Sequence, residues 1–196
     1  MSDAYRTIAA PSEAVFREKM SRFLSFAFPV FSAEEARRRI AAVQNEYHDA
    51  RHVCWAYMLG ADCREFQSND NGEPSGTAGK PILGQIRSFE LTNVVICVVR
   101  YFGGIKLGTS GLIAAYREAA RLALDAAEIV ERHETADITF SFPYLAMNDV
   151  MRLVKQSSAE IVCQSFDNSC EMTLRLPRET AEALKARLED LDGVTF

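Results

Sequence analysis

The sequence predicts a two-domain protein of the α/β (α+β) class, and three observations support this prediction. Segments rich in β-branched and aromatic residues alternate with segments whose apolar residues recur at helical spacing. Two glycine-rich stretches, 70–81 and 100–112, each lead directly into a helical pattern. A polar segment at 127–135 precedes a compact remainder. We therefore expect one domain over residues 1–130 and a second over 131–196.

The composition is typical of a globular protein without bulk affinity for nucleic acid. The 196 residues are 48% apolar, which is enough for a packed core, and the net charge of −5 argues against binding nucleic acid through overall charge. Residues 132–196 hold 11 of the 27 acidic residues but only 7 of the 22 basic ones. The composition therefore does not exclude a local basic face on the first domain. With no apolar run of membrane-spanning length and no secretion-signal layout, we expect a cytoplasmic protein without membrane contact.

The five cysteines include no C-x-x-C pair and predict no zinc framework. Cys54 and Cys97 lie in apolar strand patterns, so we expect both to be small buried thiols of the core. Cys163 and Cys170 lie on either side of an expected hairpin turn and could face each other, although reduced thiols are favoured in the cytosol.

The first elements follow from local patterns. Residues 5–31 alternate loosely between apolar and polar and predict one or two strands. Ser32 followed by Glu35 is a capping box, and the helical spacing after it predicts a helix over 33–47. The short aromatic segment 52–59 predicts a buried strand.

Two helices and a central strand accompany the glycine-rich stretches. A two-turn helix is expected with Pro81 at its first position, where the missing N–H is tolerated. The β-branched run 91–99 predicts a strand covered on both faces. A longer helix is expected over 111–128, capped by Thr109 or Ser110.

The remainder has the order of a ferredoxin-like βαββαβ domain, with two helices on a four-stranded sheet. The expected elements are a strand over 135–142, a helix over 144–157, a strand over 159–166, a turn at Asp167-Asn168, a strand over 169–176, a helix over 178–190 and a short strand over 194–196.

The two glycine-rich stretches are candidate anion sites. Such loops let backbone N–H groups converge, and a helix that begins there presents unpaired amides and its positive dipole end. Lys80, Arg100 and Lys106 flank the stretches and would add charge, so we hypothesise a site for phosphate or the RNA backbone. In the alternative reading, the glycines serve tight turns and the cations are solvated. The candidate residues are Gly76, Thr77, Gly79, Lys80, Arg100, Gly103, Gly104, Lys106, Gly108, Thr109 and Ser110.

Known nucleotide-binding signatures are missing from these stretches. Gly103 and Gly108 have P-loop spacing, but Thr109 follows where the P-loop has lysine, and no G-x-G-x-x-G occurs. Asp70 and Glu73 form a possible acidic site, which with Ser75 would serve a hydrolase or phosphate-ligand enzyme. Because no nucleophile–base pair has a recognisable spacing and the acids match no metal-ligand pattern, we expect a binding protein without catalytic residues, metal or cofactor.

Three long motifs resemble those of the YigZ/IMPACT family. They are His48-Asp-Ala-Arg-His52, the stretch 70–81, and 99–116, and the resemblance covers roughly residues 15–130. The acidic tail resembles the extra C-terminal domain of bacterial members. Two departures are Asn71, where the family usually has Asp, and Ser110, where it usually has Gly.

The resemblance implies a first domain like domain 2 of ribosomal protein S5, and a ferredoxin-like second domain similar to domain V of elongation factor G. Eukaryotic members restrain the phosphorylation of a translation initiation factor, and RNA or ribosome binding has been inferred for bacterial members from their fold. By this resemblance we expect a translation-associated regulator whose partner is RNA, the ribosome or a translation-regulatory protein.

Overall fold

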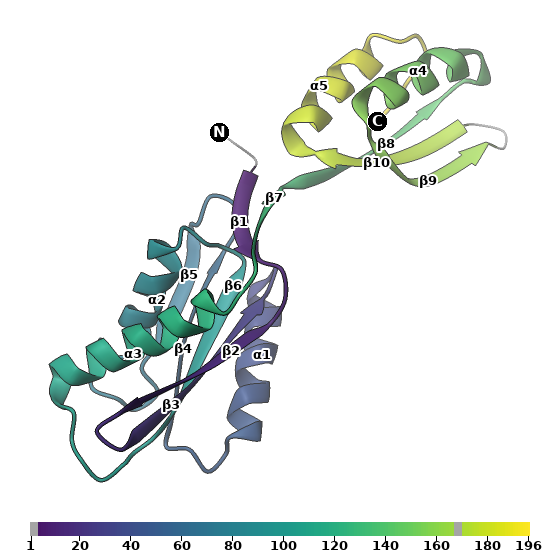
Figure 1. Cartoon of the computed structure of the whole chain (residues 1–196). Helices are drawn as coiled ribbons and strands as arrows, with labels where there is room; N and C mark the ends of the chain where they lie inside the picture. Colours follow the sequence, from purple (N-terminus) through teal and green to yellow (C-terminus); the bar gives the residue numbers. More distant parts are fainter. Residues whose placement is uncertain (1–3, 167–169) are drawn as a thin grey trace. The chain divides into compact units, whose positions relative to one another are not determined.

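The computed structural model describes residues 4–166 and 170–196. The chain divides into two compact units, one over Tyr5–Arg132 and the other over His133–Phe196 together with Ala4. We call them the N-terminal and the C-terminal unit and describe each by itself (Figure 1). Each combines helices with a largely antiparallel sheet, which confirms the predicted α/β class.

The described part of the N-terminal unit forms a five-stranded antiparallel sheet in the order β2-β3-β6-β4-β5. Its strands are β2 (Ser12–Glu18), β3 (Ser21–Pro29), β4 (His52–Leu59), β5 (Glu65–Asn69) and β6 (Val94–Tyr101). A further strand, β1 (Ala4–Ile8), pairs with β7 (Ile129–His133). The region 5–31 therefore holds three strands rather than one or two, and β5 was not expected.

Helices cover both faces of this sheet. Helix α1 (Ala33–Glu46) packs on one face against β4 and β6, while α2 (Gly79–Ser88) and α3 (Gly108–Asp125) pack on the other (Figure 1). The capping box of α1 is confirmed, since Ser32 Oγ accepts the Glu35 N–H at 3.1 Å.

Both other helices begin earlier than expected. Helix α2 starts at Gly79, two residues before Pro81. Helix α3 starts at Gly108, so Thr109 and Ser110 lie inside its first turn, and neither caps it. Their amides, rather than their hydroxyls, are thus the groups at the helix start.

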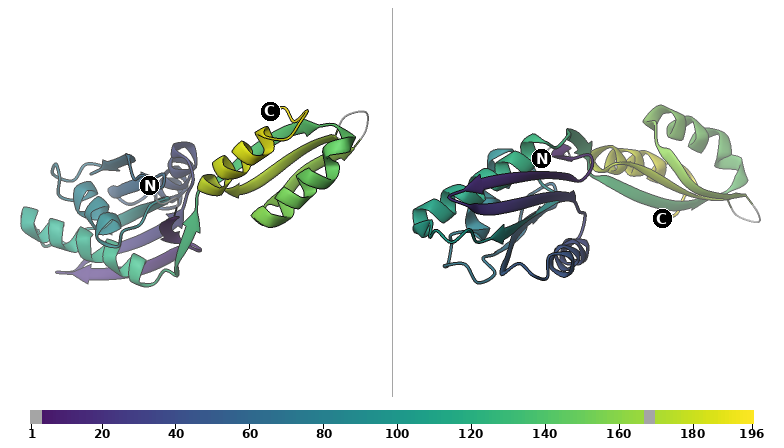
Figure 2. Two further views of the ribbon diagram at one scale, coloured as in Figure 1. Left: turned by 90° about the horizontal axis from the view of Figure 1, so that it is seen from above. Right: turned by 60° about the horizontal axis from the view of Figure 1, so that its bottom comes forward.

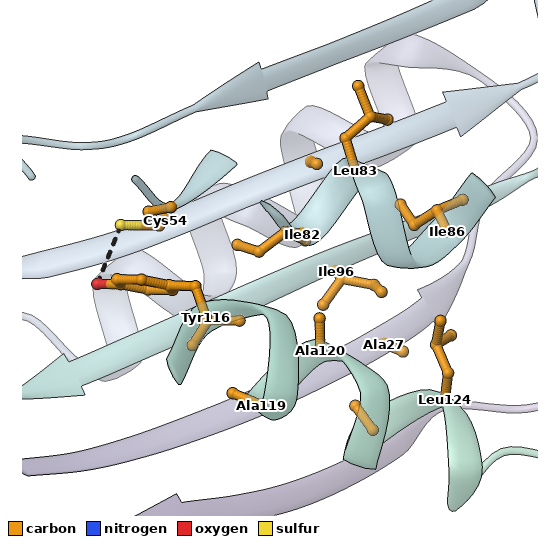
Figure 3. Packing of buried hydrophobic residues seen from close by; sticks show 14 of the residues in the cluster. Ala27, Cys54, Ile82, Leu83, Ile86, Ile96, Tyr116, Ala119, Ala120 and Leu124 are labelled. Carbon is orange, nitrogen blue, oxygen red and sulfur yellow. Dashed lines mark hydrogen bonds between the residues drawn. The ribbon is translucent and has the colours of Figure 1, made fainter. Parts of the chain in front are cut away.

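The core lies on both sides of β6, whose residues from Val94 to Arg100 are all buried, as expected of a central strand. On one side the small side chains of α3 allow its backbone to approach the sheet closely, and Ile82 and Ile86 of α2 pack beside them (Figure 3). The buried alanines of α3 are Ala115, Ala119, Ala120 and Ala123.

The C-terminal unit has its helices on one face of a sheet ordered β8-β10-β9 (Figure 2). Its elements are β8 (Thr135–Phe142), a short 3-10 helix (Tyr144–Ala146), α4 (Met147–Ser157), β9 (Glu160–Phe166), β10 (Cys170–Pro177) and α5 (Arg178–Glu189). The expected last strand is an isolated bridge between Thr195 and Ser141 on the free side of β8. This completes the strand order of a ferredoxin-like fold. The expected turn at Asp167-Asn168 lies outside the described residues.

Cys163 and Cys170 lie on opposite faces of the C-terminal sheet. Cys163 is exposed and pairs with Thr173, whereas Cys170 is buried and pairs with Phe166. Since Cys170 and Thr173 are three residues apart on one strand, their side chains point to opposite faces. The expectation that the two thiols could face each other is wrong. Cys54 and Cys97 are buried, as predicted.

Candidate functional site

The first glycine-rich stretch folds around the carboxylate of Asp70. This carboxylate accepts backbone N–H bonds from Gly76 at 2.8 Å, Ala78 at 3.0 Å and Gly79 at 2.8 Å. Partial burial raises the pKa of Asp70, but these hydrogen bonds and the Lys80 charge outweigh burial and hold the pKa below its ordinary value. The amides that we expected to bind an external anion at the start of α2 instead bind the protein's own carboxylate.

The remaining residues of this stretch have structural contacts as well. Thr77 is buried and its hydroxyl donates to the Pro74 carbonyl at 2.6 Å. A Cβ on Gly79 would lie 2.8 Å from the backbone nitrogen of Asn69, and Gly76 has a φ of +77°. Close packing and a tight turn therefore account for these glycines.

A buried polar network joins this stretch to the sheet and to α3. Arg100 Nη1 donates to Glu73 Oε1 at 2.6 Å, and the Tyr116 hydroxyl donates to the same oxygen at 2.8 Å. The Cys54 thiol lies 3.3 Å from the Tyr116 hydroxyl (Figure 3). Burial raises the pKa of Cys54 to about 12, so this thiol stays protonated.

Arg100 is held in this network with one donor unused. Its side chain is 8% exposed and that of Glu73 is 4% exposed. The guanidinium lies over the ring of Phe23 at 5.7 Å and over that of Phe102 at 5.6 Å. Among the described residues, Arg100 Nε has no hydrogen-bond partner. A buried donor without a partner carries a desolvation cost, so this nitrogen reduces the net stability that the network provides.

A cavity of about 600 Å³ adjoins Arg100, and we call it the β6–α3 cavity. Its lining comes from the segment that leads into β4, Glu73 and Pro74 of the first glycine-rich stretch, the end of β6, the loop between β6 and α3, and the first turns of α3. Arg100, Leu107 and Leu112 are buried lining residues, whereas Arg51, Lys106 and Thr109 are exposed. The lining therefore combines buried residues with exposed, basic ones.

The electrostatics of the cavity favour an anion. Its formal charges are those of Arg51, Arg100 and Lys106 against Asp49 and Glu73. Glu73 is paired with Arg100, and Asp49 accepts a hydrogen bond from the Tyr101 hydroxyl at 2.7 Å, which raises the pKa of Tyr101. Asp49 keeps its negative charge when it accepts from a neutral hydroxyl, so the three cations exceed the two acids by one and the net formal charge of the lining favours an anion.

The start of α3 adds backbone donors to the same cavity. Gly108 and Thr109 are its first two residues and both line the cavity. Within the described chain, no side chain caps this helix start. The first amides of a helix have no acceptor inside the helix, and the dipole favours negative charge there.

The cavity unites only part of the predicted site. Arg100, Lys106, Gly108 and Thr109 line it. Ser110 follows in the first turn of α3, and Gly104 has a φ of +88° in the loop before it. Gly103 is a packing residue, because a Cβ there would lie 2.0 Å from the Met20 carbonyl carbon. Gly76, Thr77, Gly79 and Lys80 lie outside the lining, in the loop around Asp70 and the start of α2, although Glu73 and Pro74 of the same stretch line the cavity.

Sequence reasoning missed three residues that line the cavity at the start of β4 and just after β6. Arg51 and His52 line the cavity, and so does Phe102. His52 Nδ1 lies 2.8 Å from the Asn71 carbonyl oxygen, so this nitrogen carries the proton of the bond. The motif His48-Asp-Ala-Arg-His52 contains two of these residues and was the signal available.

The acidic residues of the predicted enzyme site are committed to structural bonds. Asp70 accepts three backbone amides, and Glu73 accepts Arg100 and Tyr116. In residues 4–166 and 170–196, no group of three or more His, Cys, Asp or Glu side chains could hold a metal ion.

No helix of the described chain has both the length and the apolarity to span a membrane.

Comparison with known proteins finds similarity along the whole chain. Residues 19–124 match the family described as the Impact N-terminal domain. An IMPACT family member of Haemophilus influenzae is 34% identical over 91% of this chain and 89% of its own. IMPACT family member YigZ of Escherichia coli is 32% identical over 93% and 90%. A crystal structure of a hypothetical protein matches with a TM-score of 0.74 and 31% identity, covering 98% of this chain and 94% of that one.

Proposed function

Because the chain belongs to the IMPACT family, we propose that it is a translation-associated binding protein without catalytic activity, and that it binds RNA phosphate in the β6–α3 cavity. The link to translation rests on the family resemblance. The link to RNA rests on the cavity, whose cations, helix-start amides and apolar wall suit a phosphate next to a base or sugar.

One observation carries the phosphate part of this proposal. The exposed cations Arg51 and Lys106 line the same cavity as Gly108 and Thr109, the first residues of a helix that no described side chain caps. Exposed cations beside helix-start amides are an arrangement that gains free energy when an anion enters. The overall charge of −5 makes such binding local rather than spread over the surface.

The enzyme alternative receives no comparable support. It requires Asp70 or Glu73 as a general base, and both already accept hydrogen bonds from groups of the protein. The one thiol next to this network, Cys54, is buried and protonated. A nucleophile beside a free base is the signature that such chemistry needs.

Cosedimentation with ribosomes at two salt concentrations tests the proposal. Phosphate-driven binding weakens steeply between about 50 and about 200 mM salt. The variants Arg51→Ala and Lys106→Ala are expected to bind ribosomes more weakly. Each should also reduce the slope of log affinity against log salt concentration by about 1, the effect of one lost phosphate contact. Lys80→Ala is the matched control, because Lys80 is an exposed lysine of the same unit at the start of α2, outside the cavity lining.

Ribosome binding that does not respond to salt, or that Arg51→Ala and Lys106→Ala leave unchanged, would contradict binding through this cavity. Association lost equally in Lys80→Ala would point back to the first glycine-rich stretch. An interaction that survives nuclease treatment of the ribosomal RNA would indicate a protein partner.

A further inference from the structure

The shape of the β6–α3 cavity limits which part of an RNA can enter it. The cavity measures about 600 Å³ and is lined by exposed residues together with the buried Arg100, Leu107 and Leu112. This volume lies within the range of small-molecule pockets, of roughly 300–1,000 Å³. Proteins that follow a continuous strand instead use an open groove along its backbone. A cavity of this volume suits the terminal nucleotide of a chain better than a continuous strand.

The charges in the cavity match a phosphomonoester better than a backbone diester. A terminal phosphomonoester carries close to two negative charges at neutral pH, whereas an internal phosphodiester carries one. The exposed Arg51 and Lys106 and the amides at the start of α3 line this one cavity and offer several donors to an anion that enters it. The extra charge and the third free oxygen of a monoester would each use donors that a diester leaves unfilled.

An aromatic surface lies beside these donors. Phe102 lines the cavity and is 57% exposed, while the guanidinium of Arg100 lies 5.6 Å from the centre of its ring. A ring that is covered by a guanidinium and is still more than half exposed can stack on a nucleobase. Leu107 and Leu112 add apolar contacts for a sugar.

We infer that the β6–α3 cavity binds the terminal nucleotide of a single-stranded RNA, with its phosphomonoester held by Arg51, Lys106 and the first amides of α3 and its base stacked on Phe102. The inference rests on the proposed function, since it names the part of an RNA that the cavity binds. The 5′ and the 3′ end present the same chemistry, and the experiment separates them.

The test compares short single-stranded oligoribonucleotides of one sequence that differ only at their ends. One carries a 5′-phosphate, one a 3′-phosphate and one only hydroxyl groups, and binding to the full chain is followed by fluorescence anisotropy. We expect one phosphorylated oligonucleotide to bind tighter than the hydroxyl form by on the order of tenfold, the effect of one charge-assisted hydrogen bond. Lys106→Ala and Arg51→Ala should abolish this preference, and Lys80→Ala should retain it.

Phe102→Ala is expected to weaken all three oligonucleotides while leaving the phosphate preference in place, because it removes the stacking surface and none of the phosphate donors. The residues changed are exposed, so these variants are expected to fold. Equal, salt-sensitive affinities for the three oligonucleotides would overturn the inference and leave the proposed function intact. Absence of binding to any of them at low salt would overturn both.

Discussion

Removing Glu73 is expected to destabilise the N-terminal unit more than any loss of a surface ion pair. The Glu73 and Arg100 side chains are 4% and 8% exposed and are joined at 2.6 Å, and Tyr116 donates to the same oxygen. Glu73→Ala leaves a buried guanidinium without its counter-charge, which costs about 3–5 kcal/mol. Glu73→Gln keeps an acceptor for Arg100 and Tyr116 and should cost less.

Urea unfolding followed by tryptophan fluorescence measures this effect. Trp55 is the only tryptophan of the chain and lies on β4, so its emission reports on the N-terminal unit. Asp125→Ala is the matched control, because Asp125 pairs with Arg121 on the surface of α3 and both side chains are 43% exposed. Such a pair contributes about 0.3–0.5 kcal/mol.

The double variant Glu73→Leu with Arg100→Met distinguishes the cost of an unpaired buried charge from the cost of lost side-chain packing. Replacing both partners of a buried pair by apolar residues is often neutral or stabilising, so this variant should recover much of the loss caused by Glu73→Ala. A Glu73→Ala protein within about 1 kcal/mol of the wild type, no worse than the surface control, would refute the reasoning.

Three further predictions follow from the contacts described above. The pKa of Asp70 is lower in the folded than in the unfolded state, so the stability that Asp70 adds is complete above its unfolded pKa of about 3.9 and is lost as the pH falls through the folded pKa. Acid unfolding followed by Trp55 fluorescence should therefore depend less on pH in Asp70→Asn than in the wild type. The same pH dependence in both proteins would contradict this. Gly84→Ala, whose Cβ would enter open space on α2, should stabilise the protein by about 0.5–1 kcal/mol. Gly103→Ala should destabilise the protein, because its Cβ would meet the Met20 backbone. If both variants shifted the urea midpoint in the same direction, the close packing at Gly103 would be contradicted. In the native protein a thiol reagent should modify the exposed Cys63 and Cys163 and spare the three buried cysteines, and rapid reaction of a third would disagree with their burial.

The elements that the sequence predicted well are those whose side chains alternate or recur around a core. The strand at 135–142 is observed with those bounds, and the helix expected at 33–47 ends one residue earlier. Strand β5 was missed because Glu65–Asn69 is almost wholly exposed and has no apolar pattern. It is a strand because its backbone pairs with β4, and such pairing leaves no trace in the local sequence.

The candidate site was predictable only in part. Arg100 and Lys106 were identified because they flank a glycine-rich stretch that leads into a helix. Arg51 and His52 were not, because about fifty residues separate them from that stretch and only the pairing of β4 with β6 brings them near it. The role of Asp70 depends on a turn that carries its carboxylate back to the amides of Gly76 and Gly79, which composition alone does not reveal.

The most direct measurement is backbone-amide NMR of the isotope-labelled chain during titration with an end-phosphorylated oligoribonucleotide at low salt. The account predicts that the largest chemical-shift changes occur at the amides of Gly108, Thr109 and their neighbours at the start of α3. Changes confined to Gly76–Gly79, or to the C-terminal unit, would contradict it.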